Sequence, residues 1–377
     1  MLWESQVVHS GTCTDSATGA ISTPIYQTAT FRHPALGQST GFDYSRSHNP
    51  TRQAVERAIA TLERGAAGFA FASGLAAIST VMMLFRSGDH FVVSEDCYGG
   101  TYRMLEKVFK QFGLEATFVD SSSTEALAEA IRPQTRAILV ETPTNPLMKV
   151  VDLRKLVGLA RINNLLTIVD NTFLTPYLQR PLELGVGIVV HSGSKYLSGH
   201  NDVVCGLAVA REPEIGERIG FLQNAIGGIL GPQDSWLLLR GMKTLALRMD
   251  KHGSNAQKVS EWLQEHPKVK DVYYPGLSDH PGHGIQCGQA SGHGGMVSFT
   301  VADPALVPQV LERVEMIKFA ESLGGVESLI TFPAVQTHAD IPSDIRERIG
   351  INDCLLRLSV GIEHPMDIIE DLAQALG

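Results

Sequence analysis

The sequence has few cysteines, no long apolar run and no excess of positive charge. Its five cysteines (Cys13, Cys97, Cys205, Cys287, Cys354) are scattered along 377 residues with no C-x-x-C pair, so we expect reduced thiols rather than a disulfide framework. No segment approaches the roughly 18 consecutive apolar residues of a membrane span, and the first residues lack the features of a secretion signal. The net charge of −9, with no basic stripe, disfavours nucleic acid as a partner. We therefore expect a cytoplasmic protein that binds neither membrane nor nucleic acid.

Two glycine-rich nucleotide-binding motifs are also missing, G-x-G-x-x-G and G-x-x-x-x-G-K-[ST], so neither a dinucleotide nor a P-loop site gains support. The stretch Ser192-Gly193-Ser194-Lys195 matches S-x-x-K, a motif of serine β-lactamases. The companion S-D-N and K-T-G motifs of that class are absent, and its members act outside the cytoplasm. The β-lactamase interpretation is therefore disfavoured.

The composition is that of an ordinary globular protein, with 44% hydrophobic and 19% charged residues, and the length allows two or three domains. Residues 1–48 are rich in Ser, Thr and Gly and show no helical period. We expect them to form an arm that lies on another subunit. Regular structure should begin at Asn49, with Thr51 as the N-cap of a helix that ends at Gly65.

Strand and helix patterns then alternate. Strands are predicted at 69–72, 90–94, 116–120, 137–141, 165–170 and 187–190, and the helices between them include 75–85, 101–112 and 153–163. This order predicts an α/β domain over 49–243, in which helices cover both faces of a mostly parallel sheet. A long helical stretch over 236–262, interrupted near Gly241 and Gly253, leads into a smaller α+β domain over 244–377, with strands 269–274, 296–301 and 355–360 and helices 305–314 and 365–376.

One lysine follows a predicted strand of the large domain. Lys195 comes just after the apolar run 187–190, and ligands of open α/β sheets bind beyond the carboxyl ends of the strands. Apolar surroundings would lower its pKa and make the amine nucleophilic. Asp170 ends a second apolar strand. Each residue alone is usually a solvated cation or a turn former, but a lysine and an aspartate on neighbouring strands are what pyridoxal 5′-phosphate (PLP) needs, because the carboxylate keeps the ring nitrogen protonated.

A phosphate cradle is predicted where the strand at 69–72 passes through a tight turn into a helix. The amides of Gly74 and Leu75 would point at an anion at the helix N-terminus, and Ser192 and Ser194 could add hydroxyl donors. Tyr98 also lies between a strand and a helix, where it could stack on an aromatic cofactor.

These residues resemble the Cys/Met-metabolism family of PLP enzymes from end to end. The motifs that carry the resemblance are Tyr44-Ser45-Arg46 with Asn49-Pro50-Thr51-Arg52, Asp96-Cys97-Tyr98-Gly99-Gly100, Glu141-Thr142-Pro143-Thr144-Asn145-Pro146, Val169-Asp170-Asn171-Thr172, Ser192-Gly193-Ser194-Lys195-Tyr196 and Glu321-Ser322-Leu323-Gly324-Gly325. The resemblance implies the aspartate-aminotransferase-like fold (fold type I), with a large mixed, mostly parallel sheet domain and a smaller C-terminal domain. It also implies small amino-acid substrates and a homotetramer built from dimers that share active sites.

The resemblance further assigns a role to each candidate residue. It implies that Lys195 forms the Schiff base and moves protons, and that Tyr98 both stacks on the ring and acts as a catalytic residue that helps the γ-substituent leave. The other implied cofactor contacts are Asp170 at the ring nitrogen, Thr172 beside it in the sequence, Gly74, Leu75, Ser192 and Ser194 at the phosphate, and Tyr44 and Arg46, which reach the phosphate of a neighbouring subunit. The implied substrate contacts are Arg357 for the α-carboxylate, with Asn145 and Ser322 in support.

Asp43 and Glu321 resemble the acidic pair of family members that act at the substrate Cγ. Together with segments 40–44 and 337–342, they are most similar to bacterial cystathionine γ-synthases and O-acetylhomoserine thiol-lyases. We therefore favour γ-replacement on an O-acylated homoserine with cysteine, and keep cystathionine γ-lyase or β-lyase activity as alternatives. A non-catalytic protein with the same fold is a remote alternative.

The chain departs from the family pattern in two places. His48 stands where a glycine commonly precedes Asn-Pro-Thr, and segment 280–293 replaces a more helical stretch. The His and Cys residues of this segment superficially suggest a metal site, but its small residues predict a mobile loop, and we expect no metal.

Overall fold

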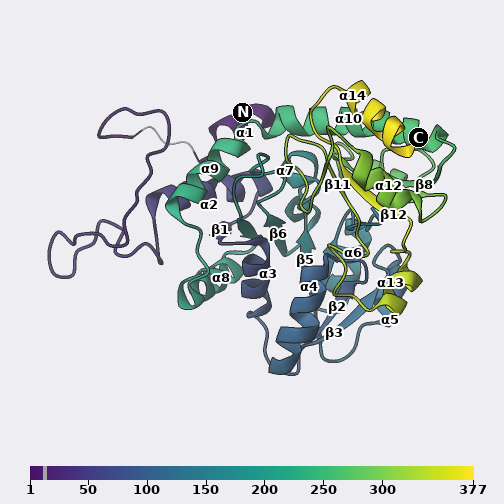
Figure 1. The fold of residues 1–377 in the computed structure, drawn as a ribbon. Helices are drawn as coiled ribbons and strands as arrows, with labels where there is room; N and C mark the ends of the chain where they lie inside the picture. The colour runs from purple at the N-terminus through teal and green to yellow at the C-terminus, as the bar shows by residue number, and fades with distance from the viewer. Residues whose placement is uncertain (12–14) are drawn as a thin grey trace.

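The computed structural model describes residues 1–11 and 15–377, so the prediction of a reduced thiol at Cys13 lies outside the described residues. The chain forms a large α/β body, a smaller sheet-and-helix region at the C-terminal end, and an N-terminal arm that extends away from both (Figure 1).

The large body is built on a seven-stranded sheet. In spatial order its strands are β1 (Ala67–Phe71), β7 (Gly206–Ala210), β6 (Ile188–Ser192), β5 (Leu166–Asp170), β4 (Thr135–Glu141), β2 (His90–Ser94) and β3 (Glu115–Val119). The strands from β6 to β3 are parallel, whereas β7 is antiparallel to both of its neighbours. The sheet is thus mixed and mostly parallel, as the sequence predicts, but β7 is a strand that the pattern did not reveal. Its Gly-Leu-Ala-Val-Ala run has little of the β-branched or aromatic character that marks a strand.

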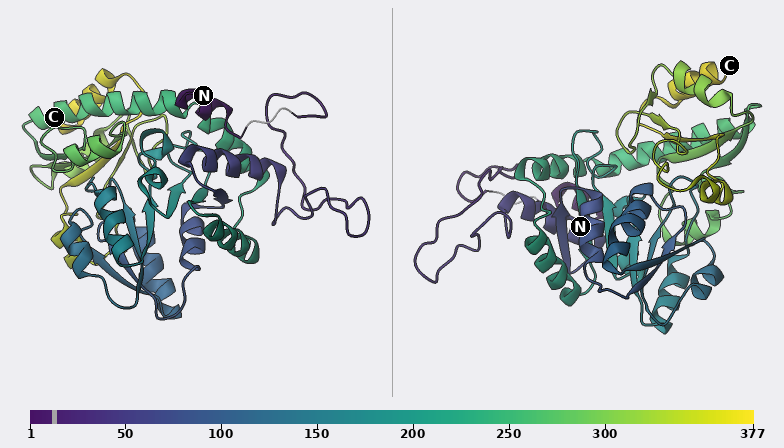
Figure 2. Two further views of the ribbon diagram at one scale, coloured as in Figure 1. Left: turned by 180° about the vertical axis from the view of Figure 1, so that it is seen from behind. Right: turned by 60° about the horizontal axis from the view of Figure 1, so that its bottom comes forward.

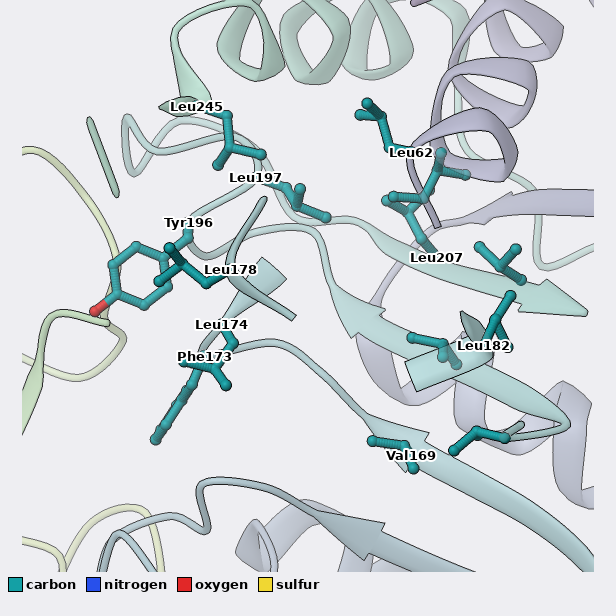
Figure 3. Close-up of a cluster of buried hydrophobic side chains, with 14 of the residues drawn as sticks. Leu62, Val169, Phe173, Leu174, Leu178, Leu182, Tyr196, Leu197, Leu207 and Leu245 are labelled. Atoms are coloured by element: carbon teal, nitrogen blue, oxygen red, sulfur yellow. The ribbon is translucent and has the colours of Figure 1, made fainter. Parts of the chain in front are cut away.

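Helices cover both faces of this sheet, because alternate strand residues enter two separate cores. Val189 and Val209 belong to a cluster that includes α2 and α6, while Val190 and Ala208 belong to a cluster that includes α3 and α8. The helices of the body are α2 (Pro50–Glu63), α3 (Gly74–Met82), α4 (Gly99–Arg103), α5 (Thr124–Glu129), α6 (Leu153–Ile162), α7 (Thr175–Leu178), α8 (Pro213–Ile226) and α9 (Pro232–Met242). Figure 3 shows part of the first cluster, which includes Tyr196 and Leu197 from the segment after β6.

Two helix predictions need correction. The predicted helix over 101–112 is broken into α4, a π-helical turn (Met104–Val108) and a 3₁₀ turn (Phe109–Phe112). The N-cap of α2 is Asn49 and not Thr51: the Asn49 side chain accepts the Thr51 amide at 3.0 Å, while the Thr51 hydroxyl donates to the Pro24 carbonyl at 2.8 Å. Thr51 is thus used to hold the arm, and Asn49 caps the helix.

The C-terminal region is built on a five-stranded sheet. In spatial order its strands are β10 (Lys318–Phe319), β11 (Leu329–Thr331), β12 (Leu355–Ser359), β9 (Met296–Val301) and β8 (Val269–Tyr273). Its helices are α10 (Leu245–Glu265), α11 (His283–Gln289), α12 (Leu306–Arg313), α13 (Ser343–Ile349) and α14 (Pro365–Leu376). α10 runs through Gly253 without the predicted interruption. The predicted mobile loop at 280–293 is wrong, because it contains α11.

The arm is only partly as expected. Residues 3–9 form α1 (Trp3–His9), which packs on this same chain: Val7 is buried, and the Arg180 guanidinium lies 4.6 Å from the Trp3 ring centroid. Much of segment 15–48 extends away from the body in both views of Figure 2. The domain limits at 48/49 and 243/244 remain predictions. A search of the described helices finds none long and apolar enough to cross a membrane.

Candidate active site

A cavity of about 740 Å³ lies where the carboxyl ends of the parallel strands meet residues from the second sheet. A volume of this size suits a small organic ligand. Most of the predicted site residues line it, namely Gly74, Leu75, Tyr98, Asn145, Asp170, Thr172, Ser192, Ser194, Lys195, Glu321, Ser322 and Arg357. The topology therefore brings together side chains that are up to 283 positions apart, since Gly74 and Arg357 share one cavity.

Lys195 follows β6 through a tight turn. Its Nζ donates to the Ser322 hydroxyl at 2.8 Å, so the amine contacts a segment from the smaller region. Burial and, to a smaller extent, the Arg357 charge lower the pKa of Lys195 to about 8, with Glu321 opposing the shift. A sizeable neutral fraction near physiological pH makes this lysine suitable as a nucleophile and as a base.

Asp170 ends β5 and begins a short chain of hydrogen bonds. The Asp170 carboxylate accepts both the amide and the hydroxyl of Thr172, and the Thr172 hydroxyl accepts the Ser192 amide at 2.8 Å. Burial raises the pKa of Asp170 above its usual range, whereas the hydrogen bonds from Thr172 lower it. A cation placed against this carboxylate would stabilise its charged form.

The predicted phosphate cradle is formed at the start of α3. Ser73 caps the helix by accepting the Ala76 amide at 3.0 Å, which leaves the first amides facing the cavity. Backbones approach closely here: a Cβ on Gly206 would lie 2.0 Å from the Ser73 carbonyl oxygen, and one on Gly74 would lie 3.1 Å from Ser192 Cβ. Ser73 is a cavity residue that the sequence reasoning missed, although it directly precedes Gly74.

The two serines of the cradle differ in their partners. The Ser194 hydroxyl donates to the Cys205 carbonyl at 3.2 Å and accepts the Cys205 amide at 2.8 Å. Its proton is therefore already used within the protein, and Ser194 must release Cys205 before it can donate to a phosphate. The phosphate-binding role of Ser194 remains a prediction, and Ser192 is the better placed donor.

Tyr98 lies at the mouth of the cavity and is 41% exposed. A Cβ on Gly100 would lie 2.5 Å from the Tyr98 ring, so the small residue at 100 allows the ring to lie back over the helix start. The Tyr98 amide donates to Glu141 at 3.1 Å. Glu141 is buried beside Asp170, and burial raises its pKa well above the usual range. No role was predicted for Glu141, although the sequence places it at the end of a strand.

Arg357 on β12 is 2% exposed, yet its guanidinium has no carboxylate among its hydrogen-bond partners in the described residues. It donates to Asn145 Oδ1 at 2.8 Å and to the Ser322 carbonyl at 2.9 Å, while its Nε has no partner. A buried cation with neutral partners and an unused donor fits an anionic group of a ligand.

Ser322 has a φ of +88°, a strained conformation for a residue with a side chain. This backbone turns its carbonyl to Arg357 and its hydroxyl to Lys195. The neighbouring Glu321 is exposed at the cavity wall. The segment thus presents one carboxylate near an amine and a guanidinium.

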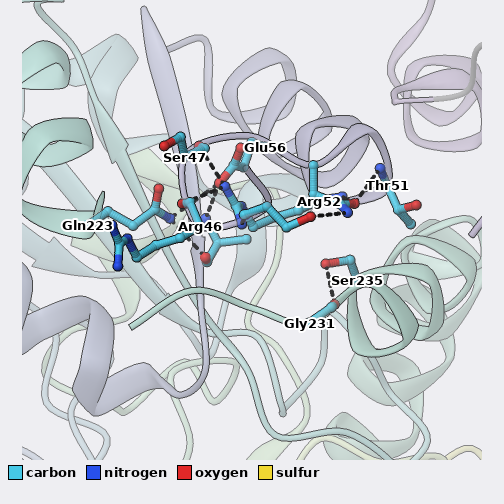
Figure 4. Close-up of polar contacts among 11 residues, drawn as sticks. Arg46, Ser47, Thr51, Arg52, Glu56, Gln223, Gly231 and Ser235 are labelled. Carbon is cyan, nitrogen blue, oxygen red and sulfur yellow. Dashed lines mark hydrogen bonds and ion pairs between the residues drawn. The ribbon is translucent and has the colours of Figure 1, made fainter. Parts of the chain in front are cut away.

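Three predicted residues lie on the arm and outside the cavity of this chain. Asp43 bonds to Ser39 Oγ at 2.6 Å, and Arg46 donates to Asn224 at 3.2 Å. Tyr44 is about half exposed, with the Arg46 guanidinium 5.6 Å from its ring centroid. The base of the arm is held by the buried Arg52, which donates to the carbonyls of residues 45–47 (Figure 4). Contacts of Asp43, Tyr44 and Arg46 with a neighbouring subunit remain a prediction.

The cavity fits PLP on the chemistry of its residues. It offers an amine of lowered pKa, a partly buried carboxylate outside any ion pair of the described residues, and the N-terminus of α3 for a phosphate. Arg357, with its unpartnered Nε, is left for a carboxylate of the substrate.

Comparison with known proteins agrees with this fit. The model of the family described as Cys/Met metabolism PLP-dependent enzyme matches residues 4–377. A cystathionine γ-lyase of Bacillus subtilis (strain 168) is 54% identical over 370 residues, which cover 98% of each chain, and a cystathionine β-lyase of Lactococcus lactis subsp. cremoris (strain MG1363) is 52% identical over 99% of this chain and 98% of its own. The crystal structure of a cystathionine γ-synthase from Xanthomonas oryzae pv. oryzae in complex with cystathionine superposes with a TM-score of 0.98 at 40% identity, over 100% of this chain and 98% of that one.

Proposed function

This chain belongs to the Cys/Met-metabolism family of PLP-dependent enzymes, and on that premise we propose that it acts on the bond between sulfur and Cγ of cystathionine. The fold is fold type I, and the enzyme is of the trans-sulfuration kind. One observation carries the finer proposal: a single cavity holds the Lys195 amine, the buried Arg357 guanidinium and the Glu321 carboxylate. These groups match a substrate with an amino-acid head and a second, cationic end.

The two charged residues would orient such a substrate. Arg357 binds the α-carboxylate with its unpartnered Nε and a neighbouring nitrogen, while Asn145 and the Ser322 carbonyl fix the plane of the guanidinium. Glu321, at the exposed wall, attracts the distal ammonium group of cystathionine. A substrate held at both ends would lie in the cavity that Lys195 also lines.

PLP, when bound, supplies an electron sink that stabilises negative charge developing at the substrate Cα. Gly74, Leu75 and Ser192 would hold its phosphate, Asp170 its ring nitrogen and Tyr98 its face. Lys195 would hold the cofactor through its amine, and as a free amine of lowered pKa it would accept the proton from Cα. Its hydrogen bond to Ser322 holds Nζ on the cavity side of the turn.

The preferred direction is γ-replacement, in which the sulfur of cysteine bonds to Cγ of an O-acylated homoserine, the acyloxy group leaves as a carboxylate, and the thiol proton is released. Segments 40–44 and 337–342 and the pair Asp43 and Glu321 support it through their resemblance to γ-synthases. The second candidate is γ-elimination, which yields cysteine, 2-oxobutyrate and ammonia from cystathionine. It is favoured by the 54% identical relative that is named a γ-lyase.

A product analysis separates these reactions. The purified holoenzyme is given O-acetylhomoserine plus cysteine in one assay and cystathionine in another, and all products are quantified. Formation of cystathionine supports γ-replacement, and release of 2-oxobutyrate from cystathionine without any synthesis assigns γ-elimination instead. Pyruvate and homocysteine as the sole products would contradict chemistry at Cγ.

Glu321→Gln tests the carboxylate itself. Because an exposed pair of charges contributes up to about 1 kcal/mol, KM for cystathionine should rise up to about fivefold while kcat changes little. Glu327→Gln is the matched control, since Glu327 is an exposed carboxylate of the same segment that bonds to Asn201 at 2.8 Å and does not line the cavity. An equal effect of both substitutions would remove Glu321 from the proposal.

We further propose that the arm completes the site of a neighbouring subunit in a tetramer of site-sharing dimers. The support is that Tyr44 and Arg46 belong to the N-terminal arm and do not line the cavity that contains Lys195 in their own chain. Lys195→Ala and Arg46→Ala chains, each poorly active alone, should regain activity when co-expressed, because mixed dimers contain one intact site. Absence of any recovery in verified mixed dimers would show that each chain uses its own arm.

A further inference from the structure

Two histidines and a cysteine meet on the C-terminal region, away from the active-site cavity. His283 and Cys287 lie one turn apart on α11, and His293 lies in the loop that precedes β9. One ligand atom from each residue lies within 4.8 Å of the others. None of the three lines the cavity that contains Lys195.

The spacing of these atoms suits a tetrahedral metal ion. Cys287 Sγ lies 3.6 Å from His283 Nε2. With metal–nitrogen distances of about 2.0–2.1 Å and metal–sulfur distances of about 2.3 Å, two ligands of a tetrahedral zinc ion stand roughly 3.5 Å apart. An i, i+4 pair on a helix reaches this distance without a change of backbone, because such residues share a face.

Each imidazole offers one ring nitrogen for coordination, and the two rings stack with their centroids 5.4 Å apart. His283 Nδ1 bonds to the Pro275 carbonyl at 2.8 Å, so it carries the proton and leaves the lone pair on Nε2, which is the atom facing Cys287. His293 Nδ1 is buried and has no hydrogen-bond partner. An unpartnered buried nitrogen is costly, and a metal ion would satisfy it.

Hydrogen bonds to the large body fix both segments that carry the three candidate metal ligands. The Gln289 side chain at the end of α11 donates to the Val151 carbonyl at 2.9 Å, and Arg154 donates to the Gly288 carbonyl at 2.8 Å. The loop that carries His293 is fixed by the Ser291 amide, which donates to the Leu178 carbonyl at 2.8 Å. Both segments are thus tied to the large body, and the three donors are pre-organised.

We propose that His283, Cys287 and His293 bind one divalent ion of the zinc class, with a fourth position open to water because Cys287 is exposed. A thiolate and two imidazoles are the ligands that zinc prefers, and magnesium or calcium would not choose them. On binding, a bond forms between the metal and Cys287 Sγ, and the thiol proton passes to the solvent. This differs from the metal-free loop expected from the sequence, because the structure forms a helix that aligns His283 with Cys287.

The test uses the holoenzyme, freed of unbound PLP by gel filtration and equilibrated with Zn²⁺ in a metal buffer. Zinc per chain is measured by mass spectrometry, and affinity by competition with a chromophoric chelator. We expect one zinc per chain, and at least a tenfold weaker affinity in Cys287→Ser and in His293→Gln. Cys354→Ser is the matched control, because Cys354 is a partly exposed free cysteine of the same region, and it should bind zinc as the wild type does.

Cofactor absorbance and far-UV circular dichroism verify that each variant is folded. Substoichiometric zinc in the wild type at micromolar free metal would overturn the proposal. So would unchanged affinity in a folded Cys287→Ser variant, since the ion would then have other ligands.

Discussion

Arg357→Lys tests whether the buried guanidinium is a carboxylate clamp. The guanidinium has an unpartnered Nε, and its outer nitrogens are held by Asn145 and the Ser322 carbonyl. A bidentate contact with a carboxylate gives two charge-assisted hydrogen bonds of about 1.5–3 kcal/mol each. Lysine keeps the positive charge but cannot make the bidentate contact. We therefore expect the binding free energy of the carboxylate to weaken by about 2–3 kcal/mol, which is a roughly 30- to 150-fold weaker affinity.

The assay compares glycine with methylamine, which differ in the carboxylate alone. Dissociation constants come from the change in cofactor absorbance when either compound is added to the holoenzyme. The wild type should strongly prefer glycine, and Arg357→Lys should lose most of that preference while its affinity for methylamine stays the same.

Arg248→Lys is the matched control, because Arg248 is also buried and donates to the Tyr196 and Gly241 carbonyls but does not line the cavity. It should lower thermal stability and keep the preference for glycine. If Arg357→Lys weakened glycine and methylamine equally, the guanidinium would serve the architecture of the site and not the carboxylate.

Two more predictions concern the cradle and the pH dependence of stability. Gly206→Ala places a Cβ 2.0 Å from the Ser73 carbonyl oxygen and should lower PLP affinity at least tenfold in reconstitution titrations, whereas Gly284→Ala, which meets no atom within 4 Å, should leave it unchanged. Burial lowers the pKa of His252 to about 4, so His252 stays neutral in the folded chain and takes up a proton on unfolding below its ordinary value of about 6.5. Above pH 6.5 this proton uptake does not reduce the free energy of unfolding. As the pH falls from 6.5 toward 4 it reduces that free energy progressively, by about 2 kcal/mol at pH 5. In urea titrations, His252→Gln should therefore lose less stability than the wild type between pH 7.5 and 5, and an identical loss would contradict the assignment.

The site residues that lie at the ends of the parallel strands could be predicted from the sequence. Asp170 and Lys195 follow neighbouring parallel strands, and parallel strands bring their carboxyl ends to one edge of the sheet. The start of α3 was found for the same reason, since a glycine between a strand and a helix marks a turn with free amides.

The other half depends on contacts that leave no local signal. Asn145 and Arg357 are 212 residues apart in the chain, and only the packing of the two sheets brings them within 2.8 Å. The left-handed conformation of Ser322 is imposed by its surroundings, because a serine has no local preference for it. The resemblance to a family therefore supplied Arg357, Asn145 and Ser322 where the physical pattern could not.

The reactivity of Lys195 depends more on the contact between the large body and the C-terminal region than on the turn that carries Lys195. The residues after Lys195 are enclosed by glycines of distant segments: a Cβ on Gly324 would lie 2.6 Å from the Tyr196 amide, and one on Gly241 would lie 2.1 Å from the Ser198 carbonyl oxygen. Burial lowers the pKa of Lys195 most, and the two charged groups that also shift it, Arg357 and Glu321, come from the smaller region. A change that separates the regions would return the amine to solvent and raise its pKa toward the ordinary 10.5, so the amine would be protonated and inactive at neutral pH. The S-x-x-K turn places the lysine, but its reactivity requires both regions to be in contact.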